Sequence, residues 1–286
     1  MFPIYIENGF SFFREKKGPN SILGDSVIVD DKHSLNELKS FLLERHIRSI
    51  RIIPAHYPIN DLGFLAELPF IEGVIVSGVS YDLAPLQSLE KLRVLSIDQI
   101  PSKLDFSRFP LLEVFSGIYS KSDLLNLNKC TKLFWLWLDK FNEDNLTEII
   151  SLTNLEYLTL HRTSIKNLYG LGQMTKLKSL NIDTANRLES LVGISLDNSS
   201  LVEIDIYLAK KLVEYSSISL AKNLEKVRLT KTGPIKSIDF LDSLRNLKRV
   251  IIGSQIVDGD VTHLKKVPKV SILDFPHYNL KNSDFL

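Results

Sequence analysis

The sequence of 286 residues has a single cysteine, Cys130, and only two methionines and two tryptophans. One cysteine excludes an internal disulfide, and with it the disulfide-rich architecture of many small extracellular domains. No stretch approaches the roughly 18 consecutive apolar residues of a membrane-spanning helix. The amino terminus also lacks the basic start and long apolar run of a secretory signal. We therefore expect a cytoplasmic localisation, which a removed leader peptide would overturn.

The chain also lacks an excess of charge of either sign and lacks familiar catalytic motifs. Its 35 basic and 34 acidic residues give a net charge of +1, so nothing global favours nucleic acid or an anionic membrane as a partner. GxGxxG, GxxxxGK[ST] and GxSxG are absent, and the six histidines share no metal-ligand spacing. We expect no cofactor and no metal.

One short pattern, apolar-x-x-apolar-x-apolar, is present in abundance. Eleven copies lie between Ile47 and Phe275, and successive copies begin 20 to 24 residues apart. A period in this range is typical of solenoids, in which each repeat is too small to bury its own apolar face. The copies begin at Ile47, Ile71, Leu92, Leu112, Leu133, Leu155, Leu177, Leu201, Leu224, Leu247 and Val270. The last is written Val270xxLeu273xPhe275.

The sixth copy carries the pattern in its fullest form, because further apolar residues follow the strand at regular spacing. It reads Leu155xxLeu158xLeu160xxThr163xIle165xxLeu168xxLeu171xxMet174. This run resembles the 22-residue leucine-rich repeat of the internalin type, and the resemblance covers residues 47–275. It implies an α/β leucine-rich repeat solenoid. In that fold a curved horseshoe has a parallel β-sheet on its concave face and 3-10 or short helical turns on its convex face.

The sequence departs from the internalin pattern in two places and in its context. Secreted internalins carry a leader and a wall anchor; we expect neither here, so a role in host invasion does not follow from the repeat. Gly117 occupies a core slot of the fourth copy, which predicts a local irregularity. The ninth position, an asparagine in that family, is never one here, so other groups or water must satisfy the turns. The ninth residues are Ala55, Val79, Ile100, Ser120, Phe141, Thr163, Ala185, Ala209, Thr232, Gln255 and Tyr278.

The repeats are flanked by segments that do not follow the period. Residues 1–46 are expected to form an N-terminal cap, residues 47–275 the repeat array, and residues 276–286 a C-terminal tail or cap. Ser34 and Glu37 have the spacing of a capping box, which predicts a helix over about 34–46. Short strand-like runs precede it at 5–6, 10–13 and 27–29. Together these elements could cover the exposed edge of the first repeat.

Strand periodicity predicts which side chains face outward. Because successive side chains alternate between faces, positions four and six of each copy point into the core, and positions three, five and seven point to the concave face. Trp135 and Trp137 fall at positions three and five of the fifth copy, so both indoles should face the concave side. Tyr157 is the neighbour of Trp135 in the next repeat, at a strand spacing of about 4.8 Å. The core slots of the fifth copy are filled by Leu133, Leu136 and Leu138.

These aromatic residues lie among charged ones, as at the centre of many protein interfaces. Acidic residues surround them (Asp98, Asp139, Asp183, Glu203 and Asp205), and a basic patch follows (Lys226, Arg228, Lys231 and Arg249). Alternatively, the tryptophans pack on each other, and the charges form a solvated face. The predicted protein-binding residues are Trp135, Trp137, Tyr157, His161, Asp139, Tyr119, Asp183, Asp205, Tyr207 and Arg228.

Such a surface suits a folded protein partner that buries on the order of 1,600 Å². We expect a non-enzymatic protein, monomeric when free, that acts as an inhibitor such as a bacterial toxin-immunity protein, or as a regulatory subunit of an enzyme. The alternative is an adaptor or assembly scaffold that uses its ends or convex face. A third hypothesis is a hydrolase centred on His161, with Asp139 and Asp183. An open strand surface disfavours this hypothesis, because such a surface neither excludes water nor supplies an oxyanion hole. Cys130 lies in an apolar slot and is expected to be a buried hydrophobe rather than a reactive thiol.

Overall fold

A computed structural model of the chain describes residues 4–14, 18–78, 81–99 and 103–285. They form two compact units, which we call the N-terminal unit, up to Leu136, and the C-terminal unit, from Trp137 onward. Two of the ninth-position residues, Val79 and Ile100, lie outside the described residues. In both units the repeats consist of a short strand followed by a return segment with a 3-10 turn, as the leucine-rich repeat resemblance implies.

The N-terminal unit begins with three short strands and one helix, which we call the cap. Strands β1 (Ile4–Glu7) and β2 (Phe10–Phe13) form an antiparallel hairpin, and β2 pairs antiparallel with β3 (Ser26–Val29). The predicted helix is confirmed as α1 (Leu35–Glu44). Its capping box is formed by Ser34 Oγ, which accepts from the Glu37 N–H at 3.3 Å, and by the Glu37 carboxylate, which accepts from the Ser34 N–H at 2.7 Å. β3 pairs in parallel with the first repeat strand, so the cap covers that strand edge.

Four repeat strands continue the sheet of the N-terminal unit in parallel register, namely β4 (Ser49–Ile52), β5 (Gly73–Val76), β6 (Val94–Ile97) and β8 (Val114–Ile118). Their core positions are fully buried, as at Ile50, Val74 and Leu95. A second, two-stranded sheet joins β7 (Leu104–Asp105) to β9 (Leu124–Leu125) in the return segments. The 3-10 turns are η1 (Pro19–Leu23), η2 (Gly63–Glu67), η3 (Ala84–Ser88), η4 (Phe106–Arg108) and η5 (Leu127–Lys129).

The irregularity predicted at Gly117 does not occur in the strand. β8 keeps full register with β6, and Gly117 lies opposite Ile97. A Cβ on Gly117 would lie 2.8 Å from Cζ of Phe115 and 3.0 Å from Cγ1 of Ile97. The missing side chain is therefore compensated by the Phe115 ring, which fills the core slot without bending the backbone.

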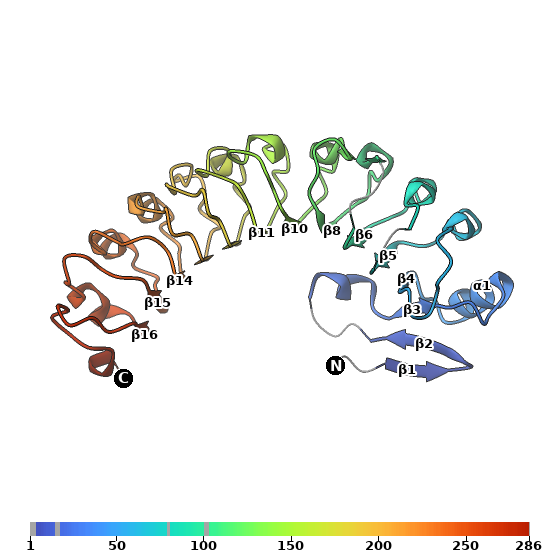
Figure 1. Cartoon of the computed structure of the whole chain (residues 1–286), viewed down its shortest axis with the longest axis horizontal. Coiled ribbons are helices and arrows are strands. Elements are labelled where there is room, and N and C mark those ends of the chain that lie inside the picture. Colours follow the sequence, from blue (N-terminus) through green and yellow to red (C-terminus); the bar gives the residue numbers. More distant parts are fainter. Residues whose placement is uncertain (1–3, 15–17, 79–80, 100–102, 286) are drawn as a thin grey trace. The chain divides into compact units, whose positions relative to one another are not determined.

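The outward-facing third positions of the N-terminal unit are not exposed as the alternation predicts. Ser49, Gly73, Val94 and Val114 are all buried. At Gly73 the cause is close packing, because a Cβ there would lie 2.6 Å from Cδ1 of Leu23. Leu23 belongs to η1 of the N-terminal segment, whereas β1, β2 and β3 continue the sheet at its edge (Figure 1). The η1 turn thus occupies part of the face that the periodicity alone assigns to solvent.

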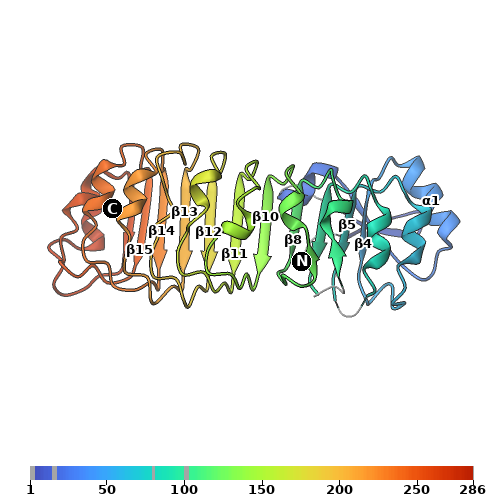
Figure 2. The same cartoon turned by 90° about the horizontal axis from the view of Figure 1, so that it is seen from above.

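The C-terminal unit contains six parallel strands after the boundary, which falls within β10 (Trp135–Asp139). They are β11 (Tyr157–His161), β12 (Ser179–Asp183), β13 (Glu203–Tyr207), β14 (Lys226–Thr230), β15 (Arg249–Gly253) and β16 (Lys269–Ile272). Each pairs with the next in unshifted register. Figure 2 shows these strands side by side. In Figure 1 the 3-10 turns that connect the strands of this unit lie along one face of its sheet, and no described turn between the strands covers the opposite face. The 3-10 turns are η6 (Thr147–Ile149), η7 (Leu171–Gln173), η8 (Ser216–Leu220), η9 (Asp239–Ser243), η10 (Thr262–Lys266) and η11 (Asn282–Phe285).

The phase predicted for the last copy is wrong by three residues. β16 pairs Val270 with Val250 and Ile272 with Ile252, so the copy begins at Val267. Leu273, expected in the core, is 56% exposed. The outward residues of the last copy are therefore Lys269, Ser271 and Leu273, and not Ile272, Asp274 and Pro276 as predicted. The ninth residue of this copy is Phe275, and not Tyr278. Both phases satisfy the apolar pattern and both give an acceptable spacing from Leu247, so periodicity alone does not separate them.

Backbone groups replace the missing asparagines in the C-terminal unit. The eighth residue of five successive copies adopts a left-handed conformation, with φ between 49° and 61°, although none is glycine or asparagine. This bend turns its N–H toward the carbonyl of position seven in the next repeat. The distances are 2.8 Å for Lys140 to His161 and for Arg162 to Asp183, and 2.9 Å for Thr184 to Tyr207. The main-chain ladder therefore extends past the strands and satisfies the turns.

The left-handed bend carries a strain that can be measured at Lys140, whose φ is 59°. The left-handed conformation costs a residue with a Cβ about 1–2 kcal/mol, and glycine avoids that cost while losing about 0.5–1 kcal/mol in chain entropy. We expect Lys140→Gly to be more stable than Lys140→Ala by roughly 0.5–1 kcal/mol in urea unfolding. Because the alanine variant removes the same side chain and keeps the strain, equal stabilities would contradict a strained ladder.

The C-terminal tail folds back on the last strand. The side-chain oxygen of Asn282 accepts from the Ile272 N–H at 2.9 Å, and the Tyr278 hydroxyl accepts from the Ile256 N–H at 2.7 Å. These contacts satisfy backbone donors at the outer edge of β16 and in the preceding turn. The tail therefore covers the end of the C-terminal unit, one of the two outcomes that the sequence allowed.

Candidate functional site

The outward face of the C-terminal sheet presents the side chains of positions three, five and seven. On β11 the core residues Leu158 and Leu160 are buried, while Tyr157 is 39% exposed. On β10, Trp137 is half-buried, and its neighbours Leu136 and Leu138 are fully buried. The alternation thus directs Trp137 and Tyr157 outward. We call this surface, from Trp137 to β16, the concave face of the C-terminal unit.

A network around Asp139 fixes the aromatic end of the concave face. Asp139 is 2% exposed and accepts from Nε of Arg162 at 2.7 Å and from a second Arg162 nitrogen. Nδ1 of His161 lies 3.0 Å from the same carboxylate, and its Nε2 lies 3.8 Å from Asp183. The Trp137 ring stacks on His161 with centroids 5.8 Å apart. The indole therefore rests on an imidazole that is itself in contact with a buried carboxylate.

The ion pairs determine the charge state of this support. Burial raises the pKa of Asp139, but the hydrogen bonds and positive charge of Arg162, with the His161 contact, outweigh burial and leave the pKa below its ordinary value. The same contact raises the pKa of Arg162. Asp139 is therefore a carboxylate at neutral pH, and its charge is neutralised within the protein.

Replacing Asp139 should reveal this pair as a stability effect that depends on pH. A carboxyl whose pKa falls on folding stabilises the protein fully above its unfolded pKa of about 3.9, and that stabilisation is lost as pH falls through the folded pKa. Asp139→Asn should lower the free energy of unfolding by about 2 kcal/mol at pH 7. The gap to wild type should narrow below pH 4. As a control, Glu189→Gln removes an exposed carboxylate and should change the free energy of unfolding by less than about 0.5 kcal/mol. If the difference in stability between Asp139→Asn and the wild type stays constant down to pH 2.5, the ion pair of Asp139 with Arg162 does not stabilise the fold.

A second buried carboxylate, Asp205, lies in the middle of the concave face. Oδ2 of Asp205 accepts from Nε of Arg228 at 2.7 Å and from a second Arg228 nitrogen, and this contact raises the pKa of Arg228. Oδ1 of Asp205 has no hydrogen-bond partner among the described residues, although the side chain is about nine-tenths buried. A buried acceptor left without a donor is uncommon and costly.

Of the remaining predicted residues, Tyr207 lies on the concave face of the C-terminal unit, whereas Trp135 and Tyr119 belong to the N-terminal unit. Tyr207 accepts from Lys231 Nζ at 2.6 Å, and that ammonium also lies 4.9 Å from the ring centroid. Trp135 and Asp98 belong to the N-terminal unit, where Trp135 is half-buried and Asp98 accepts from the Gly78 N–H. Tyr119 is only 5% exposed. As the eighth residue of its copy it lies outside the outward columns, so the expectation that it contributes to a binding surface is wrong.

The structure changes the role expected for two acidic residues, and it places at the concave face two residues that were not predicted there from the sequence. Asp139 and Asp205 are buried and ion-paired, so they support their neighbours rather than surrounding them as free charges. Arg162 was missed because the eighth position belongs to no outward column, and its left-handed backbone is not visible in the sequence. Lys269 was missed because the last copy was placed in the wrong phase.

His161, on which the hydrolase hypothesis is centred, is in contact with other side chains on several sides. Both ring nitrogens face carboxylates, and one ring face is covered by Trp137. Within the described residues, no group of three His, Cys, Asp or Glu side chains has the geometry of a metal site. Cys130 is buried as expected: burial raises its pKa to about 12, and its Sγ lies 3.4 Å from the Phe106 carbonyl oxygen. No helix in the described part of the chain is long and apolar enough to cross a bilayer.

Comparison with solved structures identifies the fold. An internalin from Listeria monocytogenes strain 4b F2365 matches with a TM-score of 0.52 at 17% identity, over 80% of this chain and 74% of its own. The functional domain of InlJ from Listeria monocytogenes, described as including a cysteine ladder, matches with a TM-score of 0.60 at 17% identity, over 79% of this chain and 50% of its own. A leucine-rich repeat protein from Leptospira interrogans matches with a TM-score of 0.61 at 15% identity, over 81% of this chain and 63% of its own.

These likenesses establish a leucine-rich repeat fold of the internalin type. The chain spans half of the InlJ domain and less than two thirds of the Leptospira protein. A scan against protein-family models and a search of curated proteins found no match. With its single cysteine, this chain cannot build a cysteine ladder.

Proposed function

We propose that the chain is a non-enzymatic binding protein that engages a folded protein partner through the concave face of its C-terminal unit. The observation that carries this proposal is the outward presentation of Trp137 and Tyr157 from a sheet whose core slots are filled by leucines. Large aromatic side chains that are ordered but accessible are the residues most enriched in binding hot spots. An open strand surface offers a protein partner more contact area than it offers a small molecule.

The support beneath the aromatic residues favours binding in the conformation already present. Trp137 rests on His161, which is itself held by Asp139 and Asp183. A side chain that is ordered before binding loses little entropy when a partner covers it. The parallel ladder and its extension through the eighth positions give the same rigidity to the backbone. The surface is therefore suited to a partner of fixed shape.

Within this function we propose an inhibitory role. A rigid surface that covers a partner's own functional site would block it without chemistry of its own, as an immunity protein blocks a toxin domain or a regulatory subunit blocks an enzyme. The single buried thiol suits the reducing cytosol, where we place this activity. The role is tested by assaying the captured partner with and without the chain; a partner whose activity is unchanged at saturation would rule out inhibition and leave binding intact.

One observation favours the alternative of an adaptor. Apolar side chains are exposed on the return segments of the C-terminal unit, away from the outward strand positions. Tyr169 is 53% exposed, Val192 37% and Val213 58%. The Leu168 N–H donates to the Val192 carbonyl at 2.9 Å, which places the first two segments side by side. A partner bound there would leave the concave face free for another.

A capture experiment with matched variants distinguishes these surfaces. The wild type, Trp137→Ala/Tyr157→Ala and Tyr169→Ala would each be immobilised and exposed to lysate of the source organism. The proposal expects a protein that binds the wild type and Tyr169→Ala but not the double variant. Loss with Tyr169→Ala alone would favour the adaptor. If no captured protein distinguishes the double variant from the wild type, the concave face is not the binding surface.

A further inference from the structure

Three cationic side chains lie opposite one another across the last strands of the concave face. Lys226 on β14 pairs with Arg249 on β15, and Arg249 pairs with Lys269 on β16. Adjacent strands lie about 4.8 Å apart, and like charges directly opposite one another destabilise a sheet. Arg249 and Lys269 are both exposed. We call these three residues the cation row.

The cation row is neutralised at one end only. Lys226 lies 3.5 Å from the Glu203 carboxylate. Among the described residues, Arg249 and Lys269 have no carboxylate within ion-pair distance, and the outward positions of β15 and β16 carry no acidic residue. Arg228 already holds Asp205 and is not available to compensate further. The excess positive charge therefore belongs to Arg249 and Lys269.

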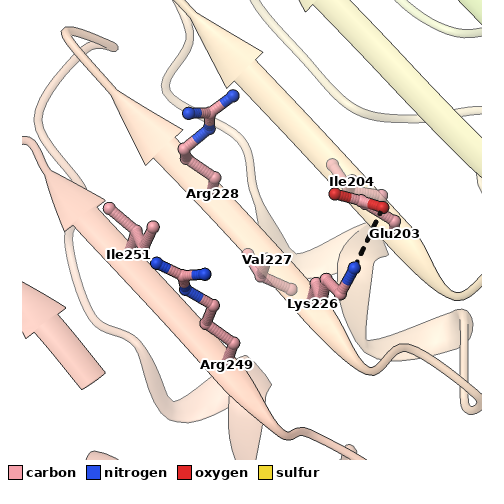
Figure 3. Close-up of a pocket in the computed structure, with 7 residues that line it drawn as sticks. All are labelled: Glu203, Ile204, Lys226, Val227, Arg228, Arg249 and Ile251. Carbon is pink, nitrogen blue, oxygen red and sulfur yellow. Dashed lines mark ion pairs between the residues drawn. The ribbon is translucent and has the colours of Figure 1, made fainter. Parts of the chain in front are cut away.

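A hollow of about 220 Å³ is lined by two members of the cation row, Lys226 and Arg249, and by Arg228; Lys269 lies outside it, opposite Arg249 on the next strand. Arg228 and Arg249 project from neighbouring strands, Ile251 lies beside Arg249 on β15 and opposite Arg228, and Lys226 turns toward Glu203 (Figure 3). Guanidinium groups bind carboxylates through paired, charge-assisted hydrogen bonds. An apolar residue beside them suits the methylene groups of an acidic side chain.

We propose that this hollow binds an aspartate or glutamate side chain of the protein partner, with Arg249 as its main contact and Lys269 beside it. This inference rests on the proposed function and specifies the partner's chemistry at one point of the same face. The surrounding acids favour a protein over a nucleic acid. Glu203 lines the hollow and Asp205 lies one strand from Arg228, so a continuous row of phosphates would meet carboxylates.

The test is an NMR titration of the full chain with defined probes. These are an acetylated and amidated octapeptide with a single central glutamate among glycines and serines, the same peptide with glutamine in that place, and an eight-charge oligothymidylate. We expect the glutamate peptide alone to shift backbone amides of β14–β16, centred on Arg249 and Lys269. Arg249→Gln should weaken this binding about fivefold, the upper range for an exposed ion pair. Arg245→Gln should leave it unchanged, since Arg245 is an exposed arginine just before β15.

Each other outcome overturns the proposal. An acidic-side-chain site would be excluded by any of three results: no shifts on β14–β16, an equal loss of peptide affinity with Arg245→Gln, or tighter binding of the oligonucleotide at the same residues.

The melting temperature shows whether the Arg249→Gln variant is folded. This substitution should not lower it, because it removes one of the opposed like charges. Trp137→Ala/Tyr157→Ala should bind the glutamate peptide normally. Failure of this site and failure of the aromatic anchors are thereby separated.

Discussion

Trp137→Ala is expected to weaken binding of the protein partner by about a hundredfold. Truncation of a central aromatic hot spot costs roughly 2–4 kcal/mol, and each 1.4 kcal/mol is a factor of ten in affinity. Trp137 has the features of such a residue: it is half-buried and stacked on His161 at 5.8 Å, and it is directed outward by the leucines on either side. Its loss removes contact area that no neighbouring side chain on the sheet can replace. Isothermal titration calorimetry with the captured partner measures the effect.

Two further variants make this result specific. Trp137→Phe keeps a ring over His161 and should lose far less affinity than the alanine variant. Tyr169→Ala removes an aromatic side chain with 53% exposure from the return segment and should bind as the wild type does. Unchanged affinity of Trp137→Ala, in a variant shown by circular dichroism to be folded, would remove Trp137 from the interface.

Gly193→Ala is expected to destabilise the C-terminal unit by about 4 kcal/mol or more. The φ of Gly193 is +125°, which strains any residue with a side chain, by about 1–3 kcal/mol. A Cβ there would lie 1.9 Å from the Leu168 carbonyl oxygen and 2.6 Å from the Tyr169 nitrogen. These are backbone atoms held by the neighbouring repeat, since the Leu168 N–H donates to Val192 at 2.9 Å. The clash can be relieved only by parting the two return segments.

Urea unfolding of Gly193→Ala and Gly172→Ala tests this claim. Gly172 has no positive φ, and the nearest atom to its added Cβ is the Ser195 hydroxyl oxygen at 3.1 Å, which a side-chain rotation can move. We expect the Gly172 variant to lose less than about 1 kcal/mol, as is usual away from special backbone positions. Similar losses at both positions would show that the close approach at Gly193 is not maintained in solution.

The repeat pattern was sufficient to predict the fold because it records burial directly. Residues at positions four and six, such as Leu180 and Ile182, are fully buried in strands β11 to β15. The pattern failed where two phases were equally apolar. Val267xxVal270xIle272 and Val270xxLeu273xPhe275 both fit, and only strand pairing with β15 selects the first. A shift of three residues exchanges the two faces, which is why Lys269 was not predicted on the concave face.

The sequence predicted which face the side chains of the candidate site point to, but not which other side chains they contact. Alternation places Trp137 and His161 on one face, yet it says nothing about a left-handed residue beyond the strand. The backbone of Arg162, with φ of 49°, accompanies a side chain that reaches back to Asp139 in the preceding repeat. Similarly, the burial of Gly73 depends on Leu23, about 50 residues earlier in the chain. Long-range packing of this kind leaves no periodic signal in the sequence.

The most direct test of a concave binding face uses Trp137 as its own reporter. Trp135→Phe leaves Trp137 as the only tryptophan, because the chain has two. In the free protein its fluorescence should be quenched by acrylamide, as expected for a half-buried, outward-facing indole. Saturation with the captured partner should reduce the quenching constant several-fold. Quenching that is already absent in the free protein, or that is unchanged in the complex, would contradict the account.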